Sequence, residues 1–215
     1  MNDRELRDHV IAALDWEPSI DSTDIGVTIE RGVVTLAGHV PNYLQRSTAE
    51  RVVKRLKGVK GFVQKIEVRP AVSAENTDEN LALRAVNSLS WNVLVPKDTI
   101  QVEVKNGWVT LNGEVEWNYQ RQAAEASVAG ISGVRGVNNT IRIRARPLVP
   151  DVKKRIEDAL KRDAEIEAKR IQVDIHDGQV TLRGKVDTLH ELDVLKRAVW
   201  SAPGVRSIDD HLIIQ

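Results

Sequence analysis

The chain has 215 residues, and its content of 41% hydrophobic and 29% charged residues is typical of a globular protein with an apolar core. Lysine and arginine total 31, and aspartate and glutamate also total 31, so no net charge attracts nucleic acid or anionic lipid. The absence of cysteine excludes disulfides, thiolate metal sites and cysteine nucleophiles.

No apolar run of about 18 residues occurs in the chain, so we predict no transmembrane segment. Residues 1–16 carry charges throughout and lack an apolar stretch of signal-peptide length. We therefore expect a cytoplasmic protein.

The chain repeats one unit three times. The phrases GVVTLAGHV, GWVTLNGEV and GQVTLRGKV begin at Gly32, Gly107 and Gly178, and the surrounding sequence aligns without a gap. The aligned segments are 4–69, 79–144 and 150–215. We predict three domains, at residues 1–70, 76–146 and 148–215.

Each unit begins with an amphipathic helix and continues with two strands. Leu6, Val10 and Leu14 recur at helical spacing, and the aligned residues of the other units are also apolar. The strands alternate between apolar and polar residues and are separated by a two-residue turn. Asn-Gly and Asp-Gly turns favour type I′ geometry, in which both residues have positive φ. The turns are Arg31-Gly32, Asn106-Gly107 and Asp177-Gly178.

The second strand of each unit contains another glycine on its inward face. This glycine either lets a helix backbone approach closely or marks a bulge, and the sequence leaves both interpretations open. The three glycines are Gly38, Gly113 and Gly184.

A second helix and a third strand complete the unit. We expect Leu44, Thr48, Val52 and Leu56 to form the buried stripe of this helix in the first unit. Each such helix is expected to end at a C-cap glycine followed by valine. These glycines are Gly58, Gly133 and Gly204.

The order α-β-β-α-β predicts an α+β fold in which two helices cover one face of a three-stranded mixed sheet. The link between the second and third strands passes through a helix, so these strands are expected to be parallel with a right-handed crossover.

This element order, the V-x-n-G-x-V-T-L-x-G-x-V hairpin and the G-V-x-x-V after the second helix resemble the BON domain, named for bacterial osmotic-shock and nodulation proteins. The resemblance covers nearly the whole chain, three times over. It implies a non-enzymatic binding module linked to osmotic or envelope stress, with phospholipid as a candidate ligand. One cytoplasmic member type pairs a BON domain with a LysM domain and binds potassium, and no LysM-like segment is visible here.

The residues themselves predict no active site and no cofactor. The five histidines form no HxH or HExxH pattern, so no metal site is expected. Residues 58–61 and 133–136 match the G-x-x-G loop of RNA-binding KH domains, but they join a helix to a strand rather than two helices. We expect no binding to nucleic acid.

The tryptophans are the candidate binding residues, because each aligns with a polar or charged residue in at least one sister unit. Trp108 aligns with Gln179, and Trp117 aligns with the expected N-cap residues Asn42 and Thr188. Such rings either pack between units or stay exposed to a lipid or protein partner. The candidates for these two roles are Trp91, Val93, Leu94, Trp108, Trp117 and Trp200.

The leading hypothesis is therefore a non-enzymatic stress-related protein of three BON-like domains that associates with phospholipid or a membrane surface. The alternatives are a sensor of K⁺ or another small ligand, since backbone carbonyls hold such ions without any sequence signature, and a protein-binding scaffold with chaperone-like action. The sequence leaves the oligomeric state and the arrangement of the units open.

Overall fold

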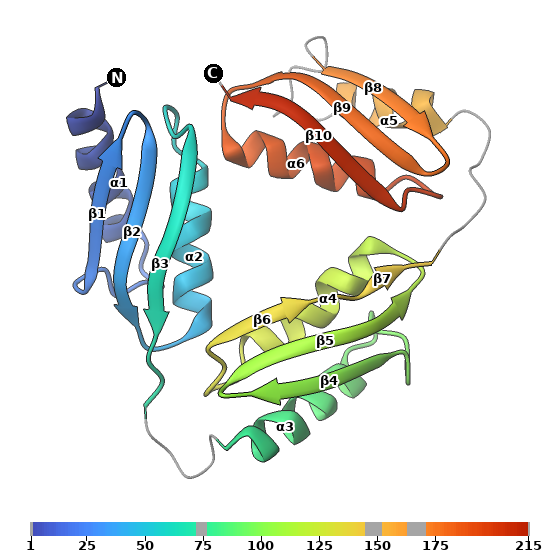
Figure 1. Cartoon of the computed structure of the whole chain (residues 1–215), viewed down its shortest axis with the longest axis horizontal. Helices are drawn as coiled ribbons and strands as arrows, with labels where there is room; N and C mark the ends of the chain where they lie inside the picture. Colours follow the sequence, from blue (N-terminus) through green and yellow to red (C-terminus); the bar gives the residue numbers. More distant parts are fainter. Residues whose placement is uncertain (1, 72–76, 145–151, 163–170, 215) are drawn as a thin grey trace.

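The computed structural model describes residues 2–71, 77–144, 152–162 and 171–214 (Figure 1). They form three α-β-β-α-β units, each with two helices on one face of a three-stranded mixed sheet. The predicted fold class is confirmed.

The units contain the same elements in the same order, except that the second unit has two short strands in place of the third strand. The first unit contains α1 (Asp3–Trp16), β1 (Ile25–Glu30), β2 (Val33–Val40), α2 (Tyr43–Lys54) and β3 (Gly61–Val68). The second contains α3 (Asp78–Trp91), β4 (Ile100–Lys105), β5 (Trp108–Val115), α4 (Asn118–Ala129), β6 (Gly136–Asn139) and β7 (Arg142–Ile143). The third contains α5 (Val152–Arg162), β8 (Ile171–His176), β9 (Gln179–Val186), α6 (Leu189–Trp200) and β10 (Ser207–Ile214).

The sheets have the predicted topology. In each unit the first two strands are antiparallel, and the third strand pairs in parallel with the second. In the second unit the third strand is divided into β6 and β7. The hydroxyl of Thr140, which lies between them, donates to the carbonyl oxygen of Leu111 at 2.8 Å.

The hairpin turns also have the predicted geometry. Arg31 and Gly32 have φ of 52° and 79°, and the turns of the other units have similar positive values at both residues. The carboxylate of Asp3, in the first turn of α1, accepts the backbone N–H groups of Arg31 and Gly32 at 2.7 and 2.9 Å. Asp78 makes the same pair of bonds in the second unit.

The glycines after the second helices have a different role from the predicted one. The helix α2 ends at Lys54 with Arg55 as its C-cap, so Gly58 lies beyond the cap, with φ of 90°. Its carbonyl oxygen would be 3.1 Å from a Cβ placed on Gly32. Gly133 and Gly204 approach the turn glycines Gly107 and Gly178 in the same way. These glycines therefore allow the chain before the third strand to lie against the hairpin turn.

The glycines in the second strands were expected to allow close approach of a helix or to mark a bulge, and the structure shows a different neighbour. A Cβ on Gly38 would lie 1.8 Å from the carbonyl oxygen of Asp24, and one on Gly113 would lie 2.2 Å from that of Thr99. Asp24 and Thr99 directly precede β1 and β4. The close approach therefore comes from the neighbouring strand's entry and not from a helix.

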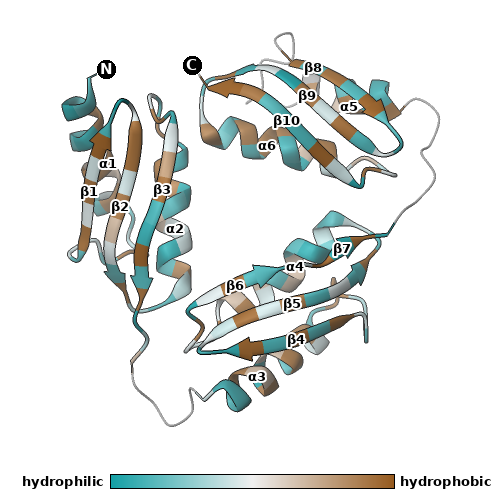
Figure 2. Ribbon diagram, viewed as in Figure 1, coloured by the Kyte–Doolittle hydropathy of each residue, from teal (hydrophilic) through white to brown (hydrophobic). Residues whose placement is uncertain are grey.

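Each unit has its own apolar core between helices and sheet. Hydrophobic positions alternate along the strands, as Figure 2 shows, and Val34 and Leu36 of β2 are fully buried. On α2 the buried residues are Thr48, Ala49 and Val53, and Val52 and Leu56 are partly buried against the same core, so the predicted stripe is wrong only at Leu44. Leu44 is 51% exposed and faces the next unit, where a Cβ on Gly130 would lie 3.8 Å from its Cδ1.

The three units are arranged as a ring (Figure 1). The second helices α2, α4 and α6 lie on its inner side, and α3 lies at its outer edge. This arrangement places the second helix of each unit next to the other two units. No local sequence pattern predicted it.

Replacing Gly32 with valine is expected to lower the free energy of unfolding by more than about 1 kcal/mol. A β-branched residue resists the φ of 79°, and its Cβ would press on the carbonyl of Gly58. Gly26→Val is the matched control on β1, where a Cβ would meet only the oxygen of Ala37 at 3.6 Å. Chemical denaturation should leave this control within about 0.5 kcal/mol of the native protein; equal losses in both variants would contradict the turn's role.

Candidate functional site

The inner helices meet head to tail around the ring. Tyr43, the first residue of α2, packs against the cores of both the first and the second unit. Leu189, the first residue of α6, packs against the core of the first unit. Asn118, the first residue of α4, lines a pocket together with Trp200 at the end of α6. The start of each inner helix therefore contacts the next unit.

Two of these junctions contain an arginine over a tryptophan ring. The guanidinium carbon of Arg46 lies 6.0 Å from the ring centre of Trp108, and that of Arg121 lies 5.0 Å from the ring centre of Trp200. The two arginines occupy aligned positions of α2 and α4. Contacts at this distance contribute about 0.5–2 kcal/mol, depending on desolvation. Burial lowers the pKa of Arg121, Glu125 opposes this shift, and the guanidinium stays charged.

An ion pair spans the junction between the third and first units, where Leu189 also packs against the first unit's core. Lys54 Nζ lies 2.9 Å from Glu50 Oε1 within α2 and 3.5 Å from Asp193 Oδ2 of α6. Burial acts to lower the pKa of Lys54, but Glu50 and Asp193 together outweigh it and raise that pKa. Lys54 is therefore charged at neutral pH and links the two units.

A polar cavity of about 720 Å³ lies where the three inner helices meet. Its lining includes Lys54 from α2, Glu125 from α4, and Asp193 and Arg197 from α6. Burial and the nearby charge of Glu125 raise the pKa of Tyr43, which also lines the cavity. Opposite charges from three units thus face one another across this space.

A second pocket, of about 470 Å³, lies between the start of α4 and the end of α6. It brings together Trp117 and Trp200, two predicted binding residues that are far apart in the sequence. Trp117 occupies the N-cap position of α4, where Gln120 Oε1 accepts its backbone N–H at 3.0 Å. We call this cavity the aromatic pocket. Sequence reasoning missed its polar members, Asn118 and Arg197, which no motif marks.

The predicted patch after α3 is exposed. Trp91, Val93 and Leu94 are 82%, 97% and 52% exposed, and we call these three residues the Trp91 patch. Trp16, at the aligned position of the first unit, is 89% exposed. Within the parts of the chain that the structure describes, no other unit covers the rings at these two helix ends.

Trp108 belongs to neither the aromatic pocket nor the Trp91 patch. The residue is 47% exposed, and its ring covers Gly136 of the adjacent strand, where a Cβ would lie 2.5 Å from the ring. Arg46 of the first unit approaches the same ring. The structure therefore places Trp108, Trp117 and Trp200 at junctions and the Trp91 patch in solvent, while their binding roles stay predictions.

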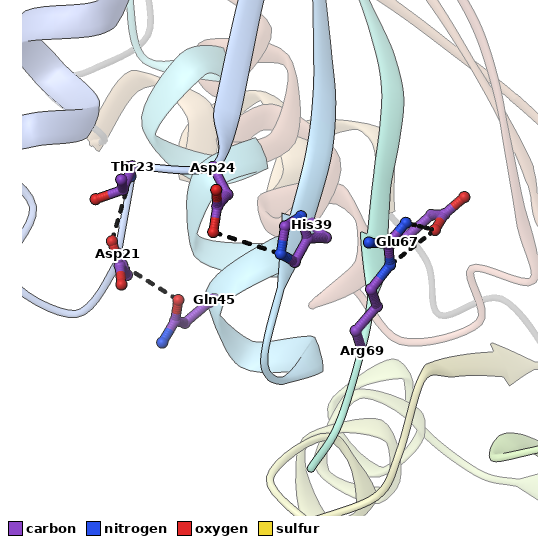
Figure 3. Close-up of polar contacts among 7 residues, drawn as sticks. All are labelled: Asp21, Thr23, Asp24, His39, Gln45, Glu67 and Arg69. Atoms are coloured by element: carbon purple, nitrogen blue, oxygen red, sulfur yellow. Dashed lines mark hydrogen bonds and ion pairs between the residues drawn. The ribbon is translucent and has the colours of Figure 1, made fainter. Parts of the chain in front are cut away.

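The polar groups at the lower end of the first sheet form surface contacts (Figure 3). His39 Nε2 lies 3.4 Å from Asp24 Oδ2, and Glu67 pairs with Arg69. Hydrogen bonds from Thr23 lower the pKa of Asp21. These contacts hold neighbouring loop and strand ends together, and they offer no buried nucleophile beside a base.

The described residues contain neither a cluster of metal-ligating side chains nor a helix that could span a membrane. No three histidine, aspartate or glutamate side chains among them lie close enough together to hold a metal ion. In the same parts of the chain, no helix combines the length and the apolar character needed to cross a bilayer.

The fold and the repeated glycine hairpin define a tandem array of small α+β domains. The model of the BON domain family matches residues 2–70, 77–145 and 149–215, and the chain belongs to this family. It is 32% identical to osmotically-inducible protein Y of Escherichia coli (strain K12) over 150 residues. These residues are 67% of this chain and 74% of that protein. Proteins of this family are not known as enzymes.

Solved structures with a weaker likeness come from CdsD, a structural protein of the type III secretion system of Chlamydia trachomatis. One is 17% identical, with a TM-score of 0.28 over 98% of this chain and 92% of the other. The C-terminal domain of CdsD is 16% identical, with a TM-score of 0.27 over the full length of both chains. These low scores carry no conclusion about fold or function.

Asp193→Asn is expected to loosen the junction between the third and first units, because it removes a charge that pairs with Lys54. The loss should be at most about 1 kcal/mol for this partly exposed pair, and it should shrink in high salt. Since the native chain lacks cysteine, two introduced cysteines can carry dyes that report the distance between these units.

Asp210→Asn is the matched control, because Asp210 pairs with Lys196 inside the third unit. It should leave the distance between the dyes unchanged. If Asp193→Asn also leaves the distance distribution unchanged at low salt, the ion pair does not hold this junction closed.

Proposed function

We propose that this protein is a non-enzymatic, stress-related binding protein that associates with a phospholipid membrane surface through the Trp91 patch. The observation that carries the proposal is the exposure of three large apolar side chains within four consecutive residues, Trp91, Val93 and Leu94. Exposed apolar groups gathered in this way mark interaction surfaces, and tryptophan suits the boundary between headgroups and acyl chains.

The loop that carries the patch is held in place by hydrogen bonds. The side chain of Asn92 donates to Ser127 Oγ of α4 at 2.8 Å and accepts the backbone N–H of Leu94 at 2.9 Å. Val95, the next residue, is buried in the core of the second unit. The patch is therefore presented outward by an ordered loop, so little entropy is lost when it binds.

The charge of the chain indicates which interaction would dominate membrane binding. The formal net charge is zero, so the general attraction of a basic protein to anionic lipid is missing. Lys97, which is exposed, is the basic residue nearest in sequence to the patch. Binding should therefore depend mainly on apolar burial and only slightly on salt.

The double variant Trp91→Ser and Leu94→Ser is expected to reduce binding to lipid vesicles by about tenfold or more, because it removes two apolar contacts. Co-sedimentation with vesicles of mixed zwitterionic and anionic phospholipid is the measurement. Detectable binding of the native protein should persist when the ionic strength is raised.

Ile213→Ser is the matched control, because Ile213 is 63% exposed but lies in the third unit. It should bind vesicles as the native protein does. Native protein that stays in the supernatant even at low salt would contradict the membrane proposal, as would equal binding by the double variant.

A further inference from the structure

The aromatic pocket has the size and the mixed lining of a small-molecule site. Its volume of about 470 Å³ lies within the range of pockets that enclose small ligands. Three aromatic side chains line it: Trp117 and Tyr119 from the start of α4, and Trp200 from the end of α6. Two units contribute, so the pocket exists only while the second and third units are joined.

The aromatic lining is specific to this junction. Trp117 aligns with Asn42 and Thr188, and Trp200 aligns with Lys54 and Ala129. The sister units therefore form the same fold without either ring, although Trp200 also packs against the core of the third unit. Tyr119 is half exposed, and both tryptophans are partly exposed, so ring surface remains available to a ligand.

Polar groups of both units lie among the rings. Arg197 comes from α6, Ser201 is the C-cap residue that follows α6, and Gln122 comes from α4. Asn118 is only 4% exposed, and within the described residues its Oδ1 has no hydrogen-bond partner. A buried acceptor without a partner is unfavourable, and a hydrogen bond from a ligand hydroxyl would remove that cost.

We propose that the aromatic pocket binds a neutral pyranose sugar. A pyranose ring has an apolar face of C–H groups that stacks on an aromatic ring, and a rim of hydroxyls that both donate and accept hydrogen bonds. The rings of Trp117 and Trp200 can stack on the apolar face of the sugar. The side chains of Asn118, Gln122 and Arg197 can form hydrogen bonds with its hydroxyls.

Other ligand classes fit the pocket less well. A cation would meet Arg197 in the lining and Arg121 over the ring of Trp200. A hydrocarbon chain would bury Asn118 and Gln122 without offering them hydrogen bonds, which is unfavourable. A neutral molecule with one apolar face and several hydroxyls satisfies both groups of side chains.

The test is a titration of the full chain with glucose and maltose, followed by the indole N–H signals of the tryptophans in NMR spectra. Saturable shifts are expected for Trp117 and Trp200 and not for Trp91. Sorbitol, which carries similar hydroxyls on an open chain, should cause no saturable shift because it lacks the stacking face.

Trp117→Asn is expected to weaken sugar binding by about tenfold or more. It keeps the start of the helix, because Asn42 caps α2 at the aligned position by accepting the N–H of Gln45 at 2.9 Å. Trp200→Ala, which copies Ala129, gives a second variant with the same expectation. Trp91→Ser is the control and should bind sugar as the native protein does.

The proposal is overturned if neither sugar causes a saturable shift of the Trp117 and Trp200 signals. It is also overturned if sorbitol binds as well as glucose, or if both pocket variants fold and keep the native affinity. The vesicle experiment is independent of these results, because the Trp91 patch contributes no residue to the aromatic pocket.

Discussion

The fold of each unit depends on one hairpin turn in which two successive residues have positive φ. In the first unit the N–H of Gly32 is bound by Asp3 of α1, and its carbonyl accepts the N–H of Lys60 at 2.9 Å. The turn thus fixes the register of β1 and β2, the start of α1 and the entry of β3. Gly58 completes the arrangement, because its carbonyl occupies the space that a Cβ on Gly32 would need.

Because these constraints lie inside each unit, the outer positions of the inner helices are free to differ. The aligned residues Lys54, Ala129 and Trp200 illustrate this freedom. Lys54 forms the ion pair that closes the ring, whereas Trp200 forms a wall of the aromatic pocket. One scaffold therefore supports junctions with different chemistry, and the candidate sites arise from the differences between copies rather than from the shared motif.

The sequence predicted the fold well because the relevant signals are local. Strand alternation and the turn glycines act over a few residues, and they repeat three times. The predicted burial of Leu44 was wrong because its apolar side chain contacts a neighbouring unit, which no helical period reveals. Comparison of the three units did identify Trp117 and Trp200 as candidates. Only the arrangement of the units in space brings these residues together with Asn118.

The three junctions between units differ in chemistry, so they should differ in their sensitivity to ionic strength. Salt screens the partly exposed pair of Lys54 and Asp193, whereas the contacts of Trp108 and Trp200 with their arginines also include apolar and dispersion contributions that salt does not remove. We therefore expect a rise in ionic strength to weaken the junction between the third and first units more than the other two, with the apolar contact of Leu189 remaining there. Opening there leaves the aromatic pocket intact, since its walls come from the second and third units.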